Sequence, residues 1–348
     1  MRKLVFITQV VDPDDPNLGA TCAKIAALAR RVDEVAVLCD RARDGALPEN
    51  CRVHVFGAPS RRQRASRYVG ALNQELRVRP FAVIAHMVPL YAIVAAPFVR
   101  PRRIPLVLWY THWKAHAVLR MATAVCTDVV SVDERSFPLS SRKVHGIGHG
   151  IDMTEFPCRP TAQSAGRALR VMTLGRYSPA KRLEDLIEGV RLARDRDVDV
   201  RIDLFGTTGT PEYETYKRGL ETLVATNGYR EFVSVGGTIP RTGVPDEYER
   251  ADVVASAFNS PDKIVLEACA SCRPVLAADV SFESLFAGIE PPLAFERGRP
   301  ETLADRIEAL AALGDEERAA IGRTLRSRVE AHHSVESWAD CILRIAER

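Results

Sequence analysis

Short apolar segments typical of β-strands alternate with helical patterns along almost the whole chain of 348 residues. Alternation of this kind predicts parallel sheets that are covered by helices on both faces. The chain is long enough for two hydrophobic cores, and the pattern breaks near 146–160. The sequence therefore predicts an α/β protein of two doubly wound domains. The predicted strands are 3–10, 34–39, 52–56, 81–85, 105–110 and 128–132 in the first half, and 169–174, 199–205, 231–235, 252–256 and 274–277 in the second.

The composition is that of a soluble globular protein, with 46% hydrophobic and 27% charged residues. A net charge of +3 is too small to indicate nucleic acid as a partner, and no RNA-binding or zinc-finger pattern occurs. Residues 81–99 lack Asp, Glu, Lys and Arg and are nearly long enough to span a bilayer. They contain Pro89 and Pro97, and we interpret them as a buried strand followed by a helix with Pro89 in its first turn. No signal peptide is recognisable, so we expect a cytoplasmic location.

Eight cysteines are scattered along the chain, most of them inside apolar strand or helix patterns. This placement is typical of free buried thiols and fits a reducing compartment. Cys269 and Cys272 form a C-x-x-C pair, but no second pair has the spacing of a zinc site. We predict a packing role for these two residues and no metal.

The segment LGRYSPAKRLEDLIEGV, residues 174–190, carries the most specific local signal. An apolar strand ends at Gly175, Arg176 and Lys181 follow, and an amphipathic helix begins near Leu183. Two cations held beside a helix N-terminus suit a diphosphate, because the backbone N–H groups and the helix dipole add to the side-chain charges. The alternative interpretation is a solvated loop that happens to carry an Arg and a Lys.

Residues 233–279 contain further motifs: Gly236-Gly237, then Tyr248, the segment Ala251-Asp252-Val253, and LEACASCRPV at 266–275. In this order, and together with the Gly-Arg and Lys of the preceding segment, they resemble the retaining glycosyltransferases of the GT-B fold, family 4 (group 1). GIGHGIDMTEF at 146–156 is similar to the segment that joins the two domains of that family. The closing HSVESWADCILRIAER is similar to its terminal crossover helix.

The resemblance implies a domain organisation. Residues 1–150 would form the N-terminal, acceptor-side Rossmann-like domain, and residues 157–331 the nucleotide-sugar donor-binding domain. Residues 332–348 would be the crossover helix that returns to the first domain. The joining segment and this crossing would then act as a double hinge on which the domains close over the donor.

The resemblance also implies roles for individual residues. Arg176 and Lys181 would bind the donor pyrophosphate, where they stabilise the charge that develops on the leaving group. Glu267 would accept hydrogen bonds from the donor ribose. Many family members have a second Glu where this chain has Asn259, and Asp262-Lys263 replaces a glycine-rich stretch, so the contacts to the donor sugar differ here. The expected donor-binding residues are Gly175, Gly236, Asn259, Lys263, Ile264, Val265 and Glu267.

In the first half, Gly19 follows a strand and a loop rich in Pro and Asp, residues 12–18, which matches the glycine-containing first loop of the family. His86 and His112 each follow an apolar strand on the expected cleft side, although a lone histidine is more often structural. We favour His112 as the histidine near the donor sugar. His86, and His149 in the joining segment, are candidates for the acceptor side.

Residues 60–79 hold six arginines. The simpler interpretation is a solvated helix face, and the alternative is a weak peripheral contact of segment 61–79 with the inner face of a membrane.

The leading functional hypothesis is the transfer of a sugar from a UDP- or GDP-linked donor to an acceptor glycan, lipid-linked glycan or small molecule, with retention. The resemblance implies no metal and no cofactor besides the donor. The runner-up is a non-catalytic, sugar-nucleotide-binding partner subunit, suggested by the absent first Glu, and a sugar-nucleotide epimerase of the same fold is third. A dinucleotide oxidoreductase is disfavoured, because no G-x-G-x-x-G follows the first strand.

Overall fold

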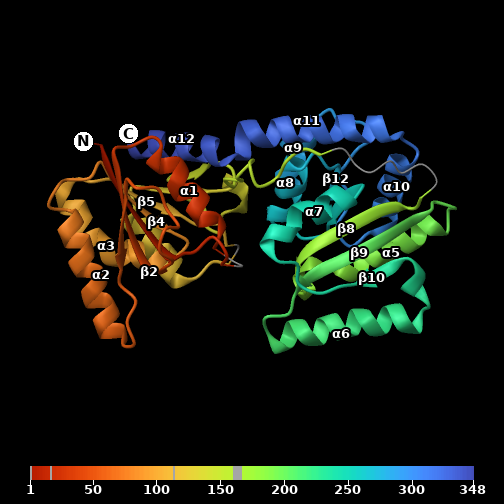
Figure 1. Cartoon of the computed structure of the whole chain (residues 1–348), viewed down its shortest axis with the longest axis horizontal. Helices are drawn as coiled ribbons and strands as arrows, with labels where there is room; N and C mark the ends of the chain where they lie inside the picture. The colour runs from red at the N-terminus through yellow and green to blue at the C-terminus, as the bar shows by residue number, and fades with distance from the viewer. Residues whose placement is uncertain (1, 16–17, 113, 160–166) are drawn as a thin grey trace. The chain divides into compact units, whose positions relative to one another are not determined.

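A computed structural model describes residues 2–15, 18–112, 114–159 and 167–348 (Figure 1). The chain divides into two compact units. The first comprises Met1–Asp152 together with His332–Arg348, and the second comprises Met153–Ala331. Each unit has its own sheet, and the two units are described separately below.

The first unit is built on a seven-stranded parallel sheet with the order β3-β2-β1-β4-β5-β6-β7. The central strands are buried on both faces, as expected of a parallel sheet that is covered by helices on both sides. The strands are β1 (Lys3–Val11), β2 (Glu34–Ala42), β3 (Cys51–Val55), β4 (Ala82–His86), β5 (Leu106–Trp109), β6 (Asp128–Ser131) and β7 (Val144–Gly146). The helices are α1 (Ala20–Ala29), α2 (Arg61–Glu75), α3 (Pro89–Val99), α4 (Ala117–Val125) and α12 (Val335–Ala346).

The two faces of this sheet carry separate hydrophobic clusters. Helices α1 and α12 contribute to one cluster, and α2, α3 and α4 contribute to the other. In the first cluster, Trp338 of α12 packs edge-on against Trp109 with ring centroids 5.5 Å apart. The terminal helix therefore completes the core of the first unit.

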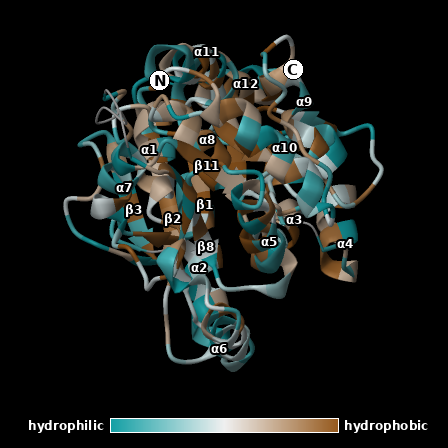
Figure 2. Ribbon diagram, turned by 90° about the vertical axis from the view of Figure 1, so that its right-hand side faces the viewer, coloured by the Kyte–Doolittle hydropathy of each residue, from teal (hydrophilic) through white to brown (hydrophobic). Residues whose placement is uncertain are grey.

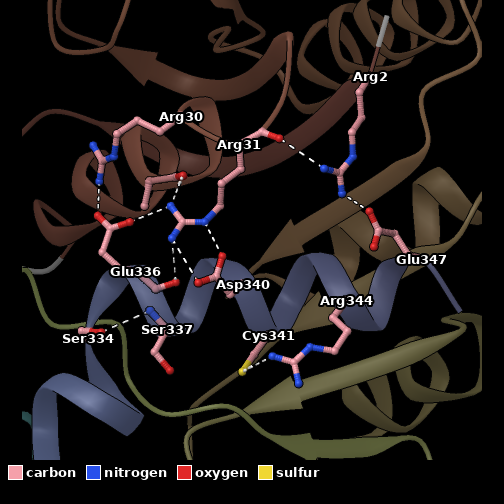
Figure 3. A network of polar contacts seen from close by, with 11 residues as sticks. Arg2, Arg30, Arg31, Ser334, Glu336, Ser337, Asp340, Cys341, Arg344 and Glu347 are labelled. Carbon is pink, nitrogen blue, oxygen red and sulfur yellow. Dashed lines mark hydrogen bonds and ion pairs between the residues drawn. The ribbon is translucent and has the colours of Figure 1, made fainter.

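Ion pairs also fasten α12 to this unit (Figure 3). Arg31, which follows α1, donates to Asp340 at 2.5 Å and to Glu336 at 2.6 Å. Arg30 also pairs with Glu336, and Arg2 pairs with Glu347 near the end of the helix. Ser334 caps the helix by accepting the backbone N–H of Ser337 at 3.1 Å (Figure 3).

The second unit is built on a five-stranded parallel sheet with the order β10-β9-β8-β11-β12. Helix α8 and strand β11 are largely hydrophobic, whereas α6 is mainly hydrophilic (Figure 2). The strands are β8 (Leu169–Arg176), β9 (Val200–Thr207), β10 (Val233–Val235), β11 (Val253–Ser256) and β12 (Val275–Ala277). The helices are α5 (Leu183–Arg194), α6 (Pro211–Thr226), α7 (Val244–Arg250), α8 (Lys263–Ala270), α9 (Glu283–Phe286), α10 (Pro300–Ala311) and α11 (Asp315–His333).

The predicted architecture of two parallel α/β sheets is confirmed. Each of the eleven predicted strand segments overlaps an observed strand. Strand β7 was not predicted, because its three residues Val-His-Gly carry no apolar pattern. Residues 81–99 form β4 and then α3, with Pro89 at the first helical position. Among the helices that the structure describes, none is long and apolar enough to cross a membrane.

The expectation of free thiols is wrong for two cysteines. Cys158 and Cys272 form a disulfide across 114 residues of sequence, with their Cα atoms 5.1 Å apart. The bond ties the segment before residue 160 to the turn that follows α8, so Cys272 is half of a covalent link inside the second unit. This pairing has no signal in the sequence, because the two residues lie in different motifs and come together only through the fold.

Candidate functional site

The carboxyl edge of the five-stranded sheet gathers most of the predicted donor-binding residues. Strand β8 ends at Arg176, β10 ends just before Gly236, and β11 ends at Ser256. Ligands of open α/β sheets bind at this edge. The same edge receives the N-terminus of α8, which carries Lys263 and Glu267.

Gly175 makes room for the side chain of Lys181. The backbone of Gly175 has φ +151°, and a Cβ atom built there would lie 2.6 Å from the Lys181 ammonium. Lys181 belongs to a short turn, 179–181, between β8 and α5, and its ammonium lies 5.5 Å from the ring centroid of Phe258. The predicted strand-turn-helix thus forms, and its lysine folds back over the end of its own strand.

A carboxylate that sequence reasoning did not assign a role holds this lysine. The ammonium of Lys181 donates to Asp262 at 2.7 Å, and the hydroxyl of Ser256 donates to the same carboxylate oxygen at 2.7 Å. The side chains of the ion pair are only 11% and 9% exposed. Asp262 stands where the sequence departs from the glycine-rich pattern, and that departure was the available signal.

Arg176 contrasts with Lys181. Its side chain is exposed at the end of β8 and forms no ion pair with any residue that the structure describes. A guanidinium in this position can bind an anion without first giving up a protein partner. Of the two predicted phosphate cations, Arg176 is therefore the accessible one and Lys181 the neutralised one.

Glu267 is a buried carboxylate and not a solvated one. It is 4% exposed, and its Oε1 atom accepts from Lys263 at 2.7 Å and from Arg241 at 3.2 Å. The hydroxyl of Tyr248 lies 3.4 Å from the other carboxylate oxygen. Burial alone would raise the pKa of Glu267, but the positive charges of Lys263 and Arg241 outweigh this and hold the pKa below its usual value.

Arg241 is the second residue that sequence reasoning missed. It lies on the short turn before α7, pairs with Glu155 as well as with Glu267, and stacks 5.7 Å above the ring of Phe156. Although burial lowers the pKa of Arg241, its two carboxylate partners raise it by more. The signal in the sequence was a lone arginine on the loop that follows the Gly-Gly turn.

The remaining predicted donor residues differ in accessibility. Asn259 is exposed on the loop between β11 and α8. Ile264 and Val265 are buried in the first turn of α8. Gly236 packs so closely that an added Cβ would lie 2.8 Å from the ring of Phe205, and its carbonyl oxygen accepts from the Tyr177 hydroxyl at 2.8 Å. The side chain of Asp262, at the N-cap position of α8, makes no capping hydrogen bond to the first N–H groups of the helix.

The histidines predicted for the first unit lie in different environments. His86 ends β4 and is 3% exposed, with its Nδ1 atom 3.2 Å from the Thr8 hydroxyl. Burial, aided by the charge of Lys24, lowers the pKa of His86 to about 3, so this imidazole is neutral. His112 lies exposed beyond β5, and its Nδ1 atom accepts the backbone N–H of Lys114 at 3.1 Å.

Gly19 and His149 occupy tight backbone positions of the first unit. A Cβ atom on Gly19 would lie 2.4 Å from the carbonyl oxygen of Pro13, so the chain before α1 requires glycine here. His149 is half-buried between Gly148 and Gly150, both of which have positive φ. The predicted acceptor loop 12–18 includes residues 16–17, which lie outside the described residues.

Two other predictions concern surfaces and metals. The arginines of 61–67 are exposed along the first turns of α2, which fits a solvated helix face.

Within the described ranges, no group of three or more His, Cys, Asp or Glu is arranged to hold a metal ion. Arg176 and the N-terminus of α8 both present positive charge at the edge that also holds the buried carboxylate of Glu267.

Residues 168–312, which lie within the second unit, match the family model of the group 1 glycosyltransferases. No curated protein matches the sequence significantly.

Solved structures share the fold over nearly the whole chain. HepE from Anabaena, solved in complex with UDP, is 18% identical with a TM-score of 0.76, and the match covers 98% of each chain. Sucrose-phosphate synthase from Thermosynechococcus elongatus is 17% identical with a TM-score of 0.73, over 99% of this chain and 98% of that one. A glycosyltransferase from Rickettsia africae is 11% identical with a TM-score of 0.76, over 99% and 98%. These likenesses establish the GT-B fold for the chain.

Proposed function

We propose that this chain, whose residues 168–312 form a group 1 glycosyltransferase domain, transfers a sugar from a nucleoside diphosphate sugar to the hydroxyl of an acceptor. The observation that carries the proposal is the meeting of Arg176, Lys181 and the uncapped N-terminus of α8 at the carboxyl edge of this domain's sheet. Cations beside a helix N-terminus whose N-cap side chain makes no capping hydrogen bond suit a diphosphate.

Glu267 supports the nucleoside part of the proposal. A carboxylate that is buried and held by Lys263 and Arg241 stays ionised and fixed in direction. An ionised, oriented carboxylate is a good acceptor for two adjacent ribose hydroxyls. We assign the ribose to Glu267 and the sugar to the side of Asn259, with Gly175, Gly236, Ile264 and Val265 shaping the walls.

The donor is proposed to be linked to UDP, and a GDP-linked donor is the alternative. HepE, which shares the fold, has been solved with UDP-glucose, and this supports testing UDP-sugars first. The acceptor would be a glycan, a lipid-linked glycan or a small molecule bound by the first unit. Gly19, His86 and His149 are the proposed acceptor-side residues, and His112 is proposed to act near the donor sugar.

The proposed reaction breaks the bond between the anomeric carbon and the diphosphate. The leaving nucleoside diphosphate gains negative charge, so Arg176 and Lys181 stabilise the transition state more than the ground state. The departing phosphate oxygen then takes the proton of the acceptor hydroxyl, which attacks from the same face and gives retention. These cations supply neutralisation that a metal ion supplies in other enzymes, and we propose that turnover needs no metal.

The direct test is a panel of UDP- and GDP-linked sugars, each offered with and without simple glycan acceptors. Release of the nucleoside diphosphate and the anomeric configuration of the product are followed by NMR. The proposal expects turnover with one donor class and a product whose anomeric configuration matches the donor.

Two other outcomes would replace the proposal. Tight nucleotide binding without turnover, in the wild type and in Asn259→Glu, would indicate the non-catalytic partner subunit. Interconversion of the sugar nucleotide without an acceptor would indicate an epimerase.

A further inference from the structure

Asp262 places a negative charge where the proposed function requires a donor diphosphate to bind. The residue immediately precedes α8, at the position from which a side chain usually caps a helix. Aspartate is among the best capping residues, yet its carboxylate makes no capping hydrogen bond here. It turns instead toward Lys181 and Ser256, each at 2.7 Å.

The charges around Asp262 leave little net attraction for a diphosphate. Lys181 faces Asp262, while Lys263 and Arg241 face Glu267. Within the part of the chain that the structure describes, Arg176 is the one cation of this cluster without an acidic partner. A diphosphate therefore has to compete with the carboxylate of Asp262 for the ammonium of Lys181.

The surroundings of Lys181 and Asp262 favour an exchange of partners, in which the diphosphate replaces the Asp262 carboxylate beside the Lys181 ammonium. Lys181 lies over the bare backbone of Gly175, and its ammonium is 5.5 Å from the ring centroid of Phe258. Asp262 and Lys181 are both largely buried, and removing one member of such a pair leaves the other charge uncompensated. An incoming anion can take over the role of the carboxylate, because it supplies the charge that Lys181 would otherwise lack.

We propose that Asp262 is an internal counter-ion of the donor site. It holds Lys181 in position between turnovers, yields the ammonium to the donor diphosphate, and takes it back when the nucleoside diphosphate leaves. This inference rests on the proposed function and adds to it a residue that sets nucleotide affinity. Asp262 thus weakens binding of the product as well as of the donor.

The test is a calorimetric titration of UDP into the purified full chain and its variants. Asp262→Asn and Asp262→Gly both remove the competing charge. Each variant is expected to bind UDP about tenfold more tightly, because a hydrogen bond to a charged group is stronger than one to a neutral group by about that factor in affinity. Asp246→Asn on α7 makes the same change in net charge at an exposed ion pair with Arg159 and should leave UDP affinity unchanged. The effects of Lys181→Met and Asp262→Asn on UDP affinity should not be additive, because the carboxylate and the diphosphate share the same ammonium.

Stability gives a second readout. Asp262→Asn should melt below the wild type, and UDP should raise its melting temperature by more than it raises that of the wild type. If Asp262→Asn does not fold, Ser256→Ala removes one donor from the still-charged carboxylate, which should strengthen its pairing with Lys181 and lower UDP affinity.

The two proposals fail differently. If neither UDP nor GDP binds, or if the nucleotide that binds has the same affinity for Lys181→Met as for the wild type, the proposed donor site itself is wrong. If UDP binding depends on Lys181 but is unchanged or weaker in folded Asp262→Asn, the donor site stands and the counter-ion role is overturned.

Discussion

Glu267 derives its proposed role from the two cations that hold it. The charges of Lys263 and Arg241 keep the pKa of this buried carboxylate low, so it remains an acceptor at neutral pH. The carboxylate is also close enough to the Tyr248 hydroxyl, at 3.4 Å, to be oriented by it.

Glu267→Gln is therefore expected to weaken UDP binding by roughly 10- to 100-fold, because the amide loses the charge and one acceptor in a desolvated site. Calorimetry on the variant measures this. Glu221→Gln, at an exposed pair with Lys217 on α6, is the matched control and should bind UDP normally. Unchanged UDP affinity in Glu267→Gln would mean that the ribose binds elsewhere. Asn259→Ala should be milder and should act mainly on the choice of sugar.

His86 makes the stability of the first unit depend on pH. Its pKa is lowered to about 3 by burial, whereas the unfolded chain takes up this proton near the ordinary value of 6.5. Below pH 6.5 the unfolded state binds the extra proton, so the free energy of unfolding falls by about 1.4 kcal/mol per pH unit, down to about pH 3.

His86→Gln should remove this contribution to the slope and leave that of His333, whose pKa burial lowers to about 4. Urea unfolding at a series of pH values between about 4 and 7 measures the slope. His332→Gln, at an exposed histidine, should keep the wild-type slope. If His86→Gln retained the same dependence, another group would be responsible.

At the scale of elements, the turn between β8 and α5 depends on one glycine. Gly175→Ala would place a methyl group 2.6 Å from the Lys181 ammonium and force a side chain into φ +151°. We expect a loss of about 1–3 kcal/mol in the free energy of unfolding from backbone strain, and UDP affinity lower by about tenfold, which corresponds to one weakened charged contact.

Gly209→Ala is the control, because an added Cβ there meets nothing within 4 Å and its φ is not positive. Denaturant unfolding and UDP titration are compared for the two variants. Equal behaviour of both would show that Lys181 does not depend on the bare backbone of Gly175.

The disulfide links the segment before residue 160 to the end of α8. By the loop-closure relation, a closed loop of 114 residues is worth about 4–5 kcal/mol to the folded state. Cys158→Ser should lower the melting temperature, and a reducing agent should lower that of the wild type to the same value. Cys341→Ser, at an unpaired cysteine, should leave it unchanged. A wild type that melts identically with and without reductant would contradict a stabilising bond.

The sequence predicted strands and helices well wherever an apolar periodicity extends over several residues. It did not predict contacts between residues that are far apart along the chain. The apolar strands, the buried face of α5 at Leu183, Leu186, Ile187 and Val190, and the loop-to-helix transition at Pro89 all follow from local periodicity. The pairing of Lys181 with Asp262, 81 residues away, and of Cys158 with Cys272 has no local signature. The role of Arg241 was likewise not predicted, because its partners Glu155 and Glu267 belong to other segments.

At the scale of the whole molecule, each unit supplies one requirement of the proposed reaction. The second unit offers a cationic edge for the donor, and the first offers a separate seven-stranded sheet for an acceptor. The terminal helix α12 is part of the first unit through Trp338 and its ion pairs with Arg30 and Arg31 (Figure 3). The chain therefore passes between the units twice, near residues 152–153 and 331–332.

Metal removal tests how the leaving group is neutralised. Because Arg176 and Lys181 are proposed to carry that charge, turnover should be unchanged after dialysis against a chelator. Rates measured before chelation, after it, and after addition of manganese or magnesium settle the point. A loss of turnover that either metal restores would place the neutralising charge on a metal ion.

In the proposed donor site, Arg176 and Lys181 bind the diphosphate of the donor. The most direct measurement is the affinity of UDP for the wild type, Arg176→Ala and Lys181→Ala by calorimetry at one ionic strength. Each substitution removes a charge-assisted bond of about 1.5–3 kcal/mol, so UDP affinity should fall by roughly 10- to 10²-fold. Wild-type affinity in both variants would contradict it.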